Sequence, residues 1–436
     1  MSSILLRLTA LFCFLNSLSY AKQCKPKVII VGGGPGGLMA AILLSQKGIP
    51  TTILEKRSQV DKWSDRSYSI SINERGQAAL ERAGCLEVAK KKGIVHDSIV
   101  LVHATLKNCL TKIPLPGKIG RGPSIRLDRP TICKIFEDAL KHDSRVTFKR
   151  NASVKKVVKL PESTSDDDEN LQIHLEDGTI LSATHIIGAD GKWSHVRKSF
   201  PELESQARVE TEGSFAIQMK KSKLPKGWDE KLVHITRPND GTFYIMTVPL
   251  INGDVSIMVV CFDELLKVNP WLTPPSNDGQ KSWDDQSNID SSSSLKVTRK
   301  LKDLFDEKVP AFLYVVGEKT LKSARLKHRT SWINFSTQSG KPGTFCTRDG
   351  RVILIGDAAH AAVPSTGEGC NMALESAMRL ADSISSNGEE VPSMETLTSG
   401  FKMYGTSRPQ ETLPIQLSAA AAANYETTSF KSKESK

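Results

Sequence analysis

The sequence predicts an α/β fold, in which a domain built on a parallel sheet is interleaved with an α+β domain that contains an antiparallel sheet. Three observations predict it. The chain has 436 residues, which exceeds the usual size of a single hydrophobic core. An apolar strand, a glycine-rich turn, a small-residue helix and a second strand follow one another over 27–55. Two apolar β-rich runs, 242–250 and 254–262, are joined through Asn252-Gly253, a dipeptide typical of tight hairpins.

The run from Lys27 to Gly37 carries the GxGxxG spacing of a dinucleotide-binding turn. Gly32 permits the tight turn, Gly34 lets the backbone approach the phosphates, and Gly37 lets helix and strand pack closely. Glu55, at the end of the second strand, is placed to accept a hydrogen bond from a ribose hydroxyl. The amides and dipole of the intervening helix favour a pyrophosphate. The sequence therefore predicts a Rossmann-type dinucleotide site, although this fingerprint does not distinguish FAD from NAD.

Further elements follow along the chain. A helical pattern covers 73–92, and the segment 98–115 alternates as strands do. A proline in its first turn opens an amphipathic helix over 129–140. Two polar stretches predict exposed loops, Pro161–Asn170 and Pro274–Ser294.

The first 21 residues predict a cleavable signal peptide. Arg7 precedes an apolar run from Leu8 to Leu18, and Ser19-Tyr20-Ala21 has small residues at the two positions that a signal peptidase reads. We therefore expect entry to the secretory pathway, with the endoplasmic reticulum lumen, the exterior or a plastid reached through it as destination. The run is too short to span a bilayer comfortably, so at most peripheral membrane contact is expected.

The charge distribution and the cysteine spacing limit the classes of ligand and partner that we expect. The net charge of +11 is spread among many acidic residues, and no arginine-rich arm or aromatic-interleaved basic patch occurs, so nucleic acid is not an expected partner. The eight cysteines show no CxxC or metal-ligand spacing. We therefore predict no metal site and interpret the cysteines as buried apolar residues and free thiols. The sequence leaves the oligomeric state open.

Two motifs at strand ends favour FAD over NAD as the bound cofactor. An apolar strand over 183–187 runs into Gly188-Ala189-Asp190-Gly191, and another over 351–355 runs into Gly356-Asp357. With GxGxxG before them, these DG and GD motifs resemble, in order and separation, the FAD-dependent aromatic hydroxylases of the single-component type. The resemblance implies FAD as cofactor, NADPH or NADH as transient reductant, and O2 as co-substrate. It also implies hydroxylation of a small molecule through a flavin C4a-hydroperoxide.

The same resemblance implies roles for individual residues. Asp190 lies in the motif linked to FAD and NAD(P)H contacts, Asp357 accepts from a ribityl hydroxyl, and Arg129 reaches the cofactor from a helix start. Further cofactor-binding positions are Val154, Cys370 and Asn371. The flavin-edge segment contains Pro364, Gly367 and Gly369, where a helix N-terminus would stabilise the charge of reduced flavin. No residue is assigned as catalytic, and His360 is expected to pack and hydrogen-bond rather than act as a base.

Over most of its length the chain is similar to kynurenine 3-monooxygenases. The matching blocks are Arg66-Ser67, Glu74–Leu80, Ile113-Pro114, His234-Ile235, Arg237-Pro238, Gly356–Pro364 and Asn424-Tyr425-Glu426, whose Asn424 would face the substrate. The arginine and tyrosine with which that family holds a substrate carboxylate fall on Ile99 or Val100 and on Leu115, and no arginine occurs from Gly93 to Gly120. Losing such a charge-assisted contact costs about 1.5 to 3 kcal/mol. We therefore expect an aromatic or apolar substrate, in a pocket lined partly by Val100 and Leu115.

The resemblance also implies domain boundaries, which interleave along the chain. They are 1–21 for the signal peptide, 24–96, 120–200 and 345–393 for the FAD-binding domain, 97–119 and 201–344 for the substrate domain, and 394–436 for a C-terminal helix and tail. Three alternative functions stay open. The first is an isoprenoid or carotenoid epoxidase, which the segment Gly188–Arg197 also resembles. The others are a flavin-binding protein without oxygenase turnover and a scaffold reused for partner binding.

Overall fold

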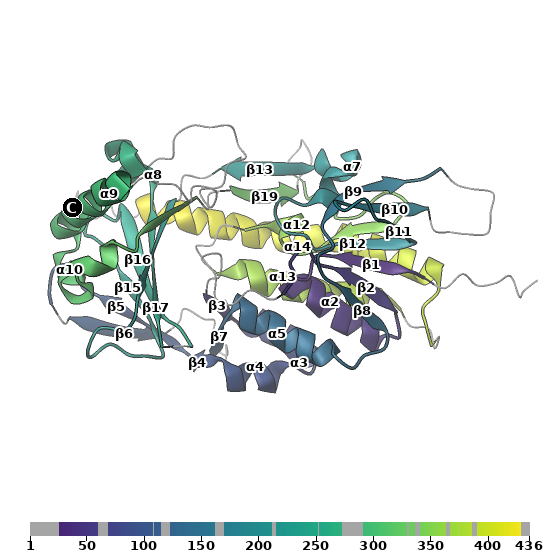
Figure 1. Cartoon of the computed structure of the whole chain (residues 1–436), viewed down its shortest axis with the longest axis horizontal. Coiled ribbons are helices and arrows are strands. Elements are labelled where there is room, and N and C mark those ends of the chain that lie inside the picture. The colour runs from purple at the N-terminus through teal and green to yellow at the C-terminus, as the bar shows by residue number, and fades with distance from the viewer. Residues whose placement is uncertain are drawn as a thin grey trace, which may run out of the picture.

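A computed structural model gives the fold of the chain. It describes residues 26–59, 69–107, 109–114, 123–161, 170–211, 215–251, 253–272, 291–328, 331–335, 341–362, 367–385 and 390–428. Two lobes lie side by side along the long axis, and one long helix, α14 (Met394–Thr428), runs along both of them (Figure 1). The predicted fold class is confirmed, with a parallel sheet in one lobe and a largely antiparallel sheet in the other. The predicted signal peptide lies outside the described residues.

The parallel sheet has the order β20-β12-β1-β2-β8, and all its neighbours run parallel. Every residue of the central strand β1 and of its neighbour β12 is buried, as expected of strands covered on both faces. Helix α2 connects β1 to β2 and packs against α5 and α13. The bounds are β1 (Val28–Val31), α2 (Pro35–Gln46), β2 (Thr51–Leu54), α5 (Arg129–Leu140), β8 (Val146–Lys149), β12 (His185–Gly188), β20 (Val352–Leu354) and α13 (Glu368–Ser383).

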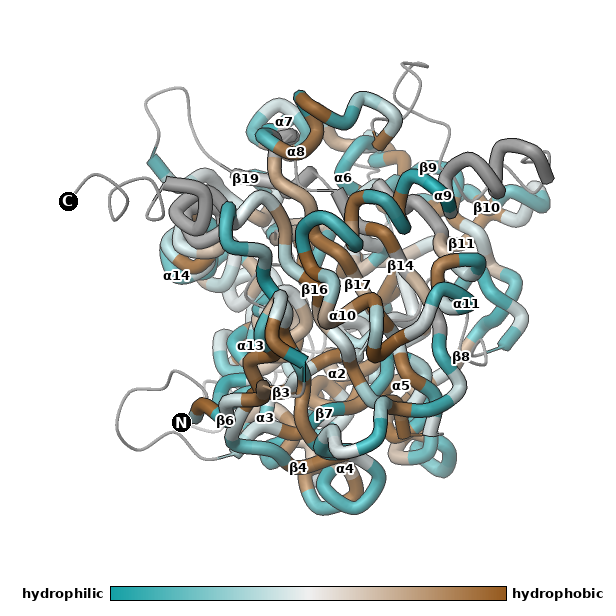
Figure 2. Tube along the Cα trace, turned by 90° about the vertical axis from the view of Figure 1, so that its left-hand side faces the viewer, coloured by the Kyte–Doolittle hydropathy of each residue, from teal (hydrophilic) through white to brown (hydrophobic). Residues whose placement is uncertain are grey.

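The second lobe contains a seven-stranded sheet of order β18-β14-β17-β16-β15-β5-β6, antiparallel except where β5 pairs with β15. One face packs against helices α9, α10 and α11 and forms a separate core, and β16 and β17 show long apolar stretches (Figure 2). The bounds are β5 (Ser98–Val102), β6 (Leu110–Pro114), β14 (Phe215–Lys221), β15 (Val233–Thr236), β16 (Phe243–Pro249), β17 (Val255–Cys261), α9 (Ser291–Lys308), α10 (Pro310–Val316), α11 (Glu318–Leu321) and β18 (Arg325–His328).

Smaller elements complete the structure. A three-stranded sheet, β3 (Ser69–Ile72), β7 (Ser124–Asp128) and β4 (Ile94–His96), lies between the lobes (Figure 1). The remaining strands are β9 (Val154–Lys159), β10 (Leu171–Leu175), β11 (Ile180–Ala183), β13 (Ala207–Thr211) and β19 (Ser331–Phe335). The remaining helices are α3 (Glu74–Arg82), α4 (Leu86–Lys92), α6 (His195–Lys198), α7 (Pro201–Glu204), α8 (Asp263–Val268), the 3-10 turn Pro270–Leu272 and α12 (Asp357–His360).

Several predicted elements are confirmed and others need correction. The helix over 129–140 has the predicted bounds, and the hairpin glycine Gly253 has a φ of +84°. The predicted helix over 73–92 is divided into α3 and α4, because Gly84 adopts a φ of +70° between them. The strand predicted over 183–187 begins at His185, since the Thr184 hydroxyl bonds the Lys27 backbone between two strands.

The two predicted polar loops are only partly described. Residues 162–169 and 273–290 lie outside the described residues. The end of the second stretch is helical, because α9 already begins at Ser291. This boundary was wrong: serine is common at helix starts, and the apolar spacing of the helix begins only a turn later.

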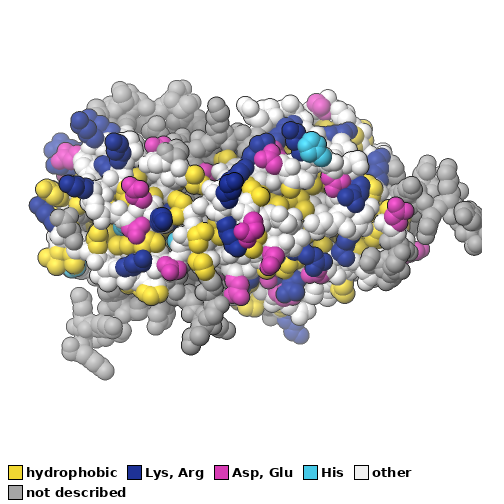
Figure 3. All heavy atoms as spheres, turned by 90° about the horizontal axis from the view of Figure 1, so that it is seen from below, with side chains coloured by type: hydrophobic (Ala, Val, Ile, Leu, Met, Phe, Trp, Pro, Cys, Tyr) yellow, Lys and Arg dark blue, Asp and Glu magenta, His cyan; other side chains and the backbone are white. Residues whose placement is uncertain are grey.

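The surface and composition of the described residues bear on partners. None of the helices they form is both long enough and apolar enough to cross a bilayer. Within the same residues, no group of three or more His, Cys, Asp or Glu side chains is arranged to hold a metal ion. On the face drawn in Figure 3, basic and acidic side chains intermingle.

Candidate cofactor and active site

The glycine turn is held by contacts that exclude a side chain. Gly32 has a φ of +110°, and a Cβ added there would lie 2.3 Å from the carbonyl oxygen of Ala189. A Cβ on Gly37 would lie 2.0 Å from the carbonyl oxygen of Gly32. Gly34 is the N-cap of α2 and provides no side-chain cap, so the first amides of the helix are not bonded by a capping side chain. The end of β1, the start of α2 and the DG motif therefore meet at backbone distance, as anion binding by a helix N-terminus requires.

The carboxylate of Glu55 closes one side of this turn. It accepts hydrogen bonds from the backbone N–H groups of Gly33, at 2.8 Å, and Arg57, at 3.0 Å. A carboxylate has about four acceptor positions, so it retains the capacity to accept from a hydroxyl. The structure thus places Glu55 beside the turn, and its contact with a ribose stays a prediction.

Arg129 and Asp357 approach the same turn from other elements. Arg129 begins α5, and its Nη2 is 3.4 Å from the position that a Cβ on Gly34 would take. Oδ1 of Asp357, at the start of α12, is 3.9 Å from the position that a Cβ on Gly369 would take. The start of α13 thus lies beside Asp357. Four helix starts, those of α2, α5, α12 and α13, border one site.

The surroundings of Asp357 indicate a recess in the surface. Its side chain is exposed to solvent, yet burial among protein atoms raises the pKa of its carboxyl group, against the opposing effects of Lys192 and Arg129. Burial also raises the pKa of the Cys370 thiol to about 12, and Cys133, Asp357 and Arg129 act on it electrostatically. The Cys370 thiol is therefore uncharged at neutral pH, and the predicted positions Arg129, Asp357 and Cys370 are neighbours.

Asn371 fixes the start of α13 to the small sheet. Its Nδ2 donates to the carbonyl oxygens of Ser71, at 3.0 Å, and Gly367, at 3.1 Å, and its Oδ1 accepts from the backbone N–H of Asn73 at 3.0 Å. Both donors of its amide group are therefore used by protein contacts, and its Oδ1 keeps one further acceptor position. Cofactor binding by Asn371 stays a prediction. Gly367, with a φ of +68°, is the N-cap of α13 and provides no side-chain cap.

Asp190 holds the start of α6, the helix whose N-cap is Ser194. Its carboxylate accepts from the Ser194 hydroxyl at 2.5 Å and from the backbone N–H groups of His195, at 2.7 Å, and Val196, at 3.2 Å. The neighbouring Arg197 donates from Nη1 to the Ala358 carbonyl oxygen at 2.9 Å. Arg197 therefore ties the DG motif to the GD motif, a positioning role that the sequence analysis did not identify. The role of Asp190 toward a cofactor stays a prediction.

The remaining predicted site residues are placed less directly. Val154 is buried at the start of β9. Val100 lies on the same face of β5 as Val102, which belongs to the core of the second lobe. Asn424 falls in the last turns of α14. Pro364 and Leu115 lie outside the described residues. The pocket predicted around Val100 and Leu115 stays a prediction.

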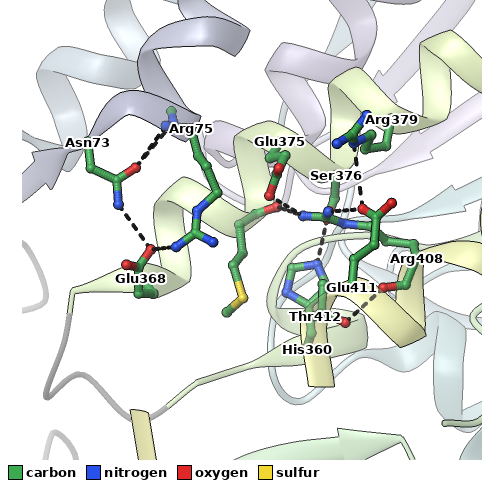
Figure 4. Close-up of polar contacts among 12 residues, drawn as sticks. Asn73, Arg75, His360, Glu368, Glu375, Ser376, Arg379, Arg408, Glu411 and Thr412 are labelled. Carbon is green, nitrogen blue, oxygen red and sulfur yellow. Dashed lines mark hydrogen bonds and ion pairs between the residues drawn. The ribbon is translucent and has the colours of Figure 1, made fainter. Parts of the chain in front are cut away.

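Two polar networks flank α13 (Figure 4). On one side, Arg75 Nη2 and Asn73 Nδ2 contact Oε2 of Glu368 at 2.8 and 3.1 Å. On the other side, the Ser376 hydroxyl lies 2.7 Å from Nε2 of His360 and accepts from Arg408 Nε at 2.9 Å. Both networks hold the helix whose N-terminus lies beside Asp357.

Arg408 is the centre of the second network. Its side chain is only 1% exposed, and it donates to Glu375 at 2.8 Å, to Glu411 at 2.5 Å and to the Met372 carbonyl oxygen at 3.3 Å. Arg408 belongs to α14, and three of its partners belong to α13. The buried ion pair of Arg408 and Glu375, with the hydrogen bonds around it, therefore holds the two helices together.

His360 is a buried neutral group. Burial and the nearby Arg408 lower its pKa to about 3, so the imidazole is uncharged over the physiological range, in line with the expected packing role. The pKa lies below the value of about 6.5 for an unfolded chain, so its contribution to stability is complete above pH 6.5 and is lost as the pH falls. When the pH falls from 6.5 to 5, we expect the unfolding free energy of both apo-proteins, wild type and His360→Gln, to change. The wild type should lose up to about 2 kcal/mol more than the variant, because only the wild type has this imidazole. Urea unfolding at both pH values measures this, and equal losses would contradict it.

Asp357 is expected to make FAD binding pH-dependent. If a hydroxyl of the cofactor donates to it, binding favours the ionised carboxylate, and the raised pKa of Asp357 means that protonation begins above the ordinary value of about 3.9. Affinity for FAD should therefore fall on acidification. Asp357→Asn should weaken binding about tenfold or more at pH 7.5 and flatten the pH dependence. Calorimetric titration with FAD measures both, and Asp177→Asn, in an exposed turn, is the control. An Asp357→Asn profile that coincides with the wild type would rule out this contact.

Comparison with known proteins agrees with this geometry. The family model described as FAD binding domain (FAD_binding_3) matches residues 25–282 and 319–394, which is more than half of the chain. The chain is 23% identical over 410 residues to 3-hydroxybenzoate 6-hydroxylase 1 of Aquipseudomonas alcaligenes, covering 91% of this chain and 89% of that protein. It is 26% identical over 431 residues to kynurenine 3-monooxygenase of Xanthomonas axonopodis pv. citri (strain 306), covering 91% and 78%.

Solved structures share the fold. HpxO of Klebsiella pneumoniae, complexed with FAD and uric acid, matches with a TM-score of 0.64 at 16% identity, covering 93% of this chain and 90% of that one. A mutant of 2-methyl-3-hydroxypyridine-5-carboxylic acid oxygenase matches with a TM-score of 0.60 at 19% identity, covering 93% and 94%. With the glycine turn and the DG and GD motifs assembled around one site, the chain belongs to the FAD binding domain family, among the FAD-dependent monooxygenases of the aromatic hydroxylase type.

Proposed function

We propose that this protein uses NADPH or NADH and O2 to hydroxylate an aromatic small molecule. The observation that carries the proposal is the convergence of the Gly32–Gly37 turn, Arg129, Asp357 and the start of α13 on one site. FAD, when bound, supplies the redox chemistry and activates dioxygen, so the chain itself needs little acid or base chemistry.

The residues present fit that cofactor. The first amides of α2 would hold the pyrophosphate, and Glu55 would accept from the ribose. Arg129 would provide positive charge beside the phosphates, and Asp357 would accept from the ribityl chain. The start of α13, with an N-cap glycine that provides no side-chain cap, would stabilise negative charge on the reduced ring.

An apolar surface favours a planar substrate. Tyr244, Val260 and Phe262 form a small cluster with Met246 and Met258. Along β16 and β17 these positions alternate with Ile245, Ile257 and Val259, which belong to the core under α9–α11. The cluster therefore lies on the opposite face of the sheet. Aromatic and thioether side chains suit an aromatic ring.

Turnover by the purified, FAD-loaded protein tests the proposal. NADPH and NADH oxidation and O2 uptake are followed with an aromatic panel that includes 3-hydroxybenzoate and kynurenine. We expect at least one member to stimulate oxidation and to gain one oxygen atom by mass spectrometry. Oxidation that no aromatic compound stimulates would instead support a flavin-binding protein without oxygenase turnover. Hydroxylation of kynurenine would show that the chain holds a carboxylate substrate without an arginine at Ile99 or Val100 and a tyrosine at Leu115.

We also propose that the chain enters the secretory pathway, from the pattern of its first 21 residues. Asn151-Ala152-Ser153 is an acceptor sequon, and Asn151 is exposed. Expression in eukaryotic cells should give a glycosylated product, whose apparent mass falls when an endoglycosidase removes the glycan. Asn151→Gln should remove that glycan, and a full-length, unglycosylated product would contradict the proposal.

A further inference from the structure

Arg126 is a buried arginine whose guanidinium has no hydrogen-bond partner among the residues that the structure describes. It lies in the middle of β7, where its neighbours Ile125 and Leu127 point into the core of the first lobe. Its own side chain therefore points to the other face of the small sheet, and it is 3% exposed. Among the described residues, none forms a hydrogen bond with its Nε, Nη1 or Nη2. The three nitrogens carry five donors in a rigid fork.

The groups around Arg126 do not neutralise it. Burial, together with the charge of Arg126, lowers the pKa of His96 to about 4. Burial and Arg126 also lower the pKa of His234 to about 4, although the charge of Asp229 acts to raise it. Both imidazoles are therefore neutral at physiological pH. Asp229 acts on Arg126 electrostatically, but its side chain is exposed, and its carboxylate accepts from the Lys231 backbone N–H at 2.8 Å. A buried charge without a paired partner is unfavourable, so its retention calls for a ligand.

The position of Arg126 links the cofactor site to the substrate lobe. Arg126 lies opposite Ser71 in the small sheet, and the Ser71 carbonyl oxygen accepts from Asn371 in the first turn of α13. On its other side, β7 pairs with β4, which leads directly into β5 of the seven-stranded sheet. His234, within electrostatic reach, comes from β15, the strand that pairs with β5. Arg126 thus lies at the junction where a substrate held against the flavin ring would meet the second lobe.

We propose that Arg126 determines specificity for an anionic substrate by binding its carboxylate group. This inference rests on the proposed function and names the class of its substrate, an aromatic acid. A planar carboxylate matches the guanidinium fork with two parallel hydrogen bonds. The neutral His96, whose Nδ1 has no hydrogen-bond partner among the described residues, adds a polar group without a competing charge. An acidic substrate replaces the expected apolar one, because Arg126 lies only six residues after the segment 93–120, which contains no arginine.

Binding of matched acids and amides to the FAD-loaded protein tests this. The probes are 3-hydroxybenzoate and kynurenine, each compared with its carboxamide by calorimetry. We expect the wild type to bind at least one acid tenfold or more tightly than its amide, and Arg126→Met to lose that preference. Arg126→Lys, which keeps the charge but not the fork, should retain part of it. The control Arg82→Met removes an exposed charge of α3 and should leave the preference unchanged.

Thermal unfolding separates a binding role from a structural one. If Arg126 is reserved for a ligand, Arg126→Met should unfold at the same temperature as the wild type or higher, because it removes an unpaired buried charge. A lower unfolding temperature with an unchanged acid preference would overturn the inference, and so would a wild type that prefers neither acid. Binding requires no turnover, so acid preference without hydroxylation would refute the proposed function while leaving the role of Arg126 standing.

Discussion

Gly37→Ala is expected to abolish tight FAD binding. The new Cβ would lie 2.0 Å from the carbonyl oxygen of Gly32 and 3.2 Å from Cβ of Ala189. Backbone atoms cannot rotate away as a flexible side chain can, so the first turn of α2 must move from the end of β1. Overpacking of this kind costs about 1 to 3 kcal/mol or more. Because the same movement displaces the amides that face the pyrophosphate, affinity for FAD should fall at least about a hundredfold.

Gly36→Ala is the matched control, one residue away in the same helix turn. Its Cβ would lie 3.5 Å from Cβ of Ala373, which is ordinary contact. Alanine is also favoured over glycine in helices by about 1 kcal/mol. We expect Gly36→Ala to fold normally and to bind FAD within a few-fold of the wild type. If calorimetry gave Gly37→Ala an FAD affinity like that of Gly36→Ala, the role assigned to the close contact of β1 and α2 would be wrong.

Arg408→Met is expected to produce the largest loss of stability. The substitution removes the partner of Glu375, which is almost fully buried with a side chain 11% exposed, and leaves a carboxylate without compensation. Breaking a buried pair from one side costs about 3 to 5 kcal/mol. Urea unfolding, read from the midpoint and the slope, measures the change. The loss should also weaken FAD binding, because Arg408 ties α14 to the helix that begins beside Asp357.

Two further variants test whether the loss of stability comes from the unpaired charge of Glu375. Arg379→Met removes an arginine that is 48% exposed and lies 3.5 Å from the same Glu411, so it should cost less than about 1 kcal/mol. Adding Glu375→Gln to Arg408→Met should recover part of the stability, because the uncompensated charge is then gone. An Arg408→Met protein as stable as Arg379→Met would show that this network does not clamp the helices.

Local chemistry made the cofactor site predictable. The functions of Gly32, Gly34 and Gly37 follow from the absence of a Cβ within one short turn, and Glu55 lies at a fixed distance along the next strand. The helix over 129–140 was equally clear, because its proline, its cap and its apolar spacing lie within a dozen residues. Such signals need no knowledge of which distant segments meet.

Long-range contacts were not predictable in this way. Arg197 bonds a carbonyl oxygen 161 residues away, and Arg408 bonds side chains of α13 that are more than thirty residues distant. In the sequence these arginines resemble any surface cation. Arg126 is the extreme case, since its burial without a hydrogen-bond partner among the described residues follows only from the assembly of β3, β7 and β4. The carboxylate of Asp190 was expected near the cofactor, but its contacts with the start of α6 depend on the loop conformation after it.

We propose that this chain holds FAD between the glycine turn and Asp357. The most direct measurement is calorimetric and absorbance titration of well-folded, purified apo-protein with FAD. We expect one FAD per chain, a flavin spectrum perturbed by the protein, and binding that Gly37→Ala abolishes and Gly36→Ala retains. A folded protein that shows no affinity for FAD would contradict the account.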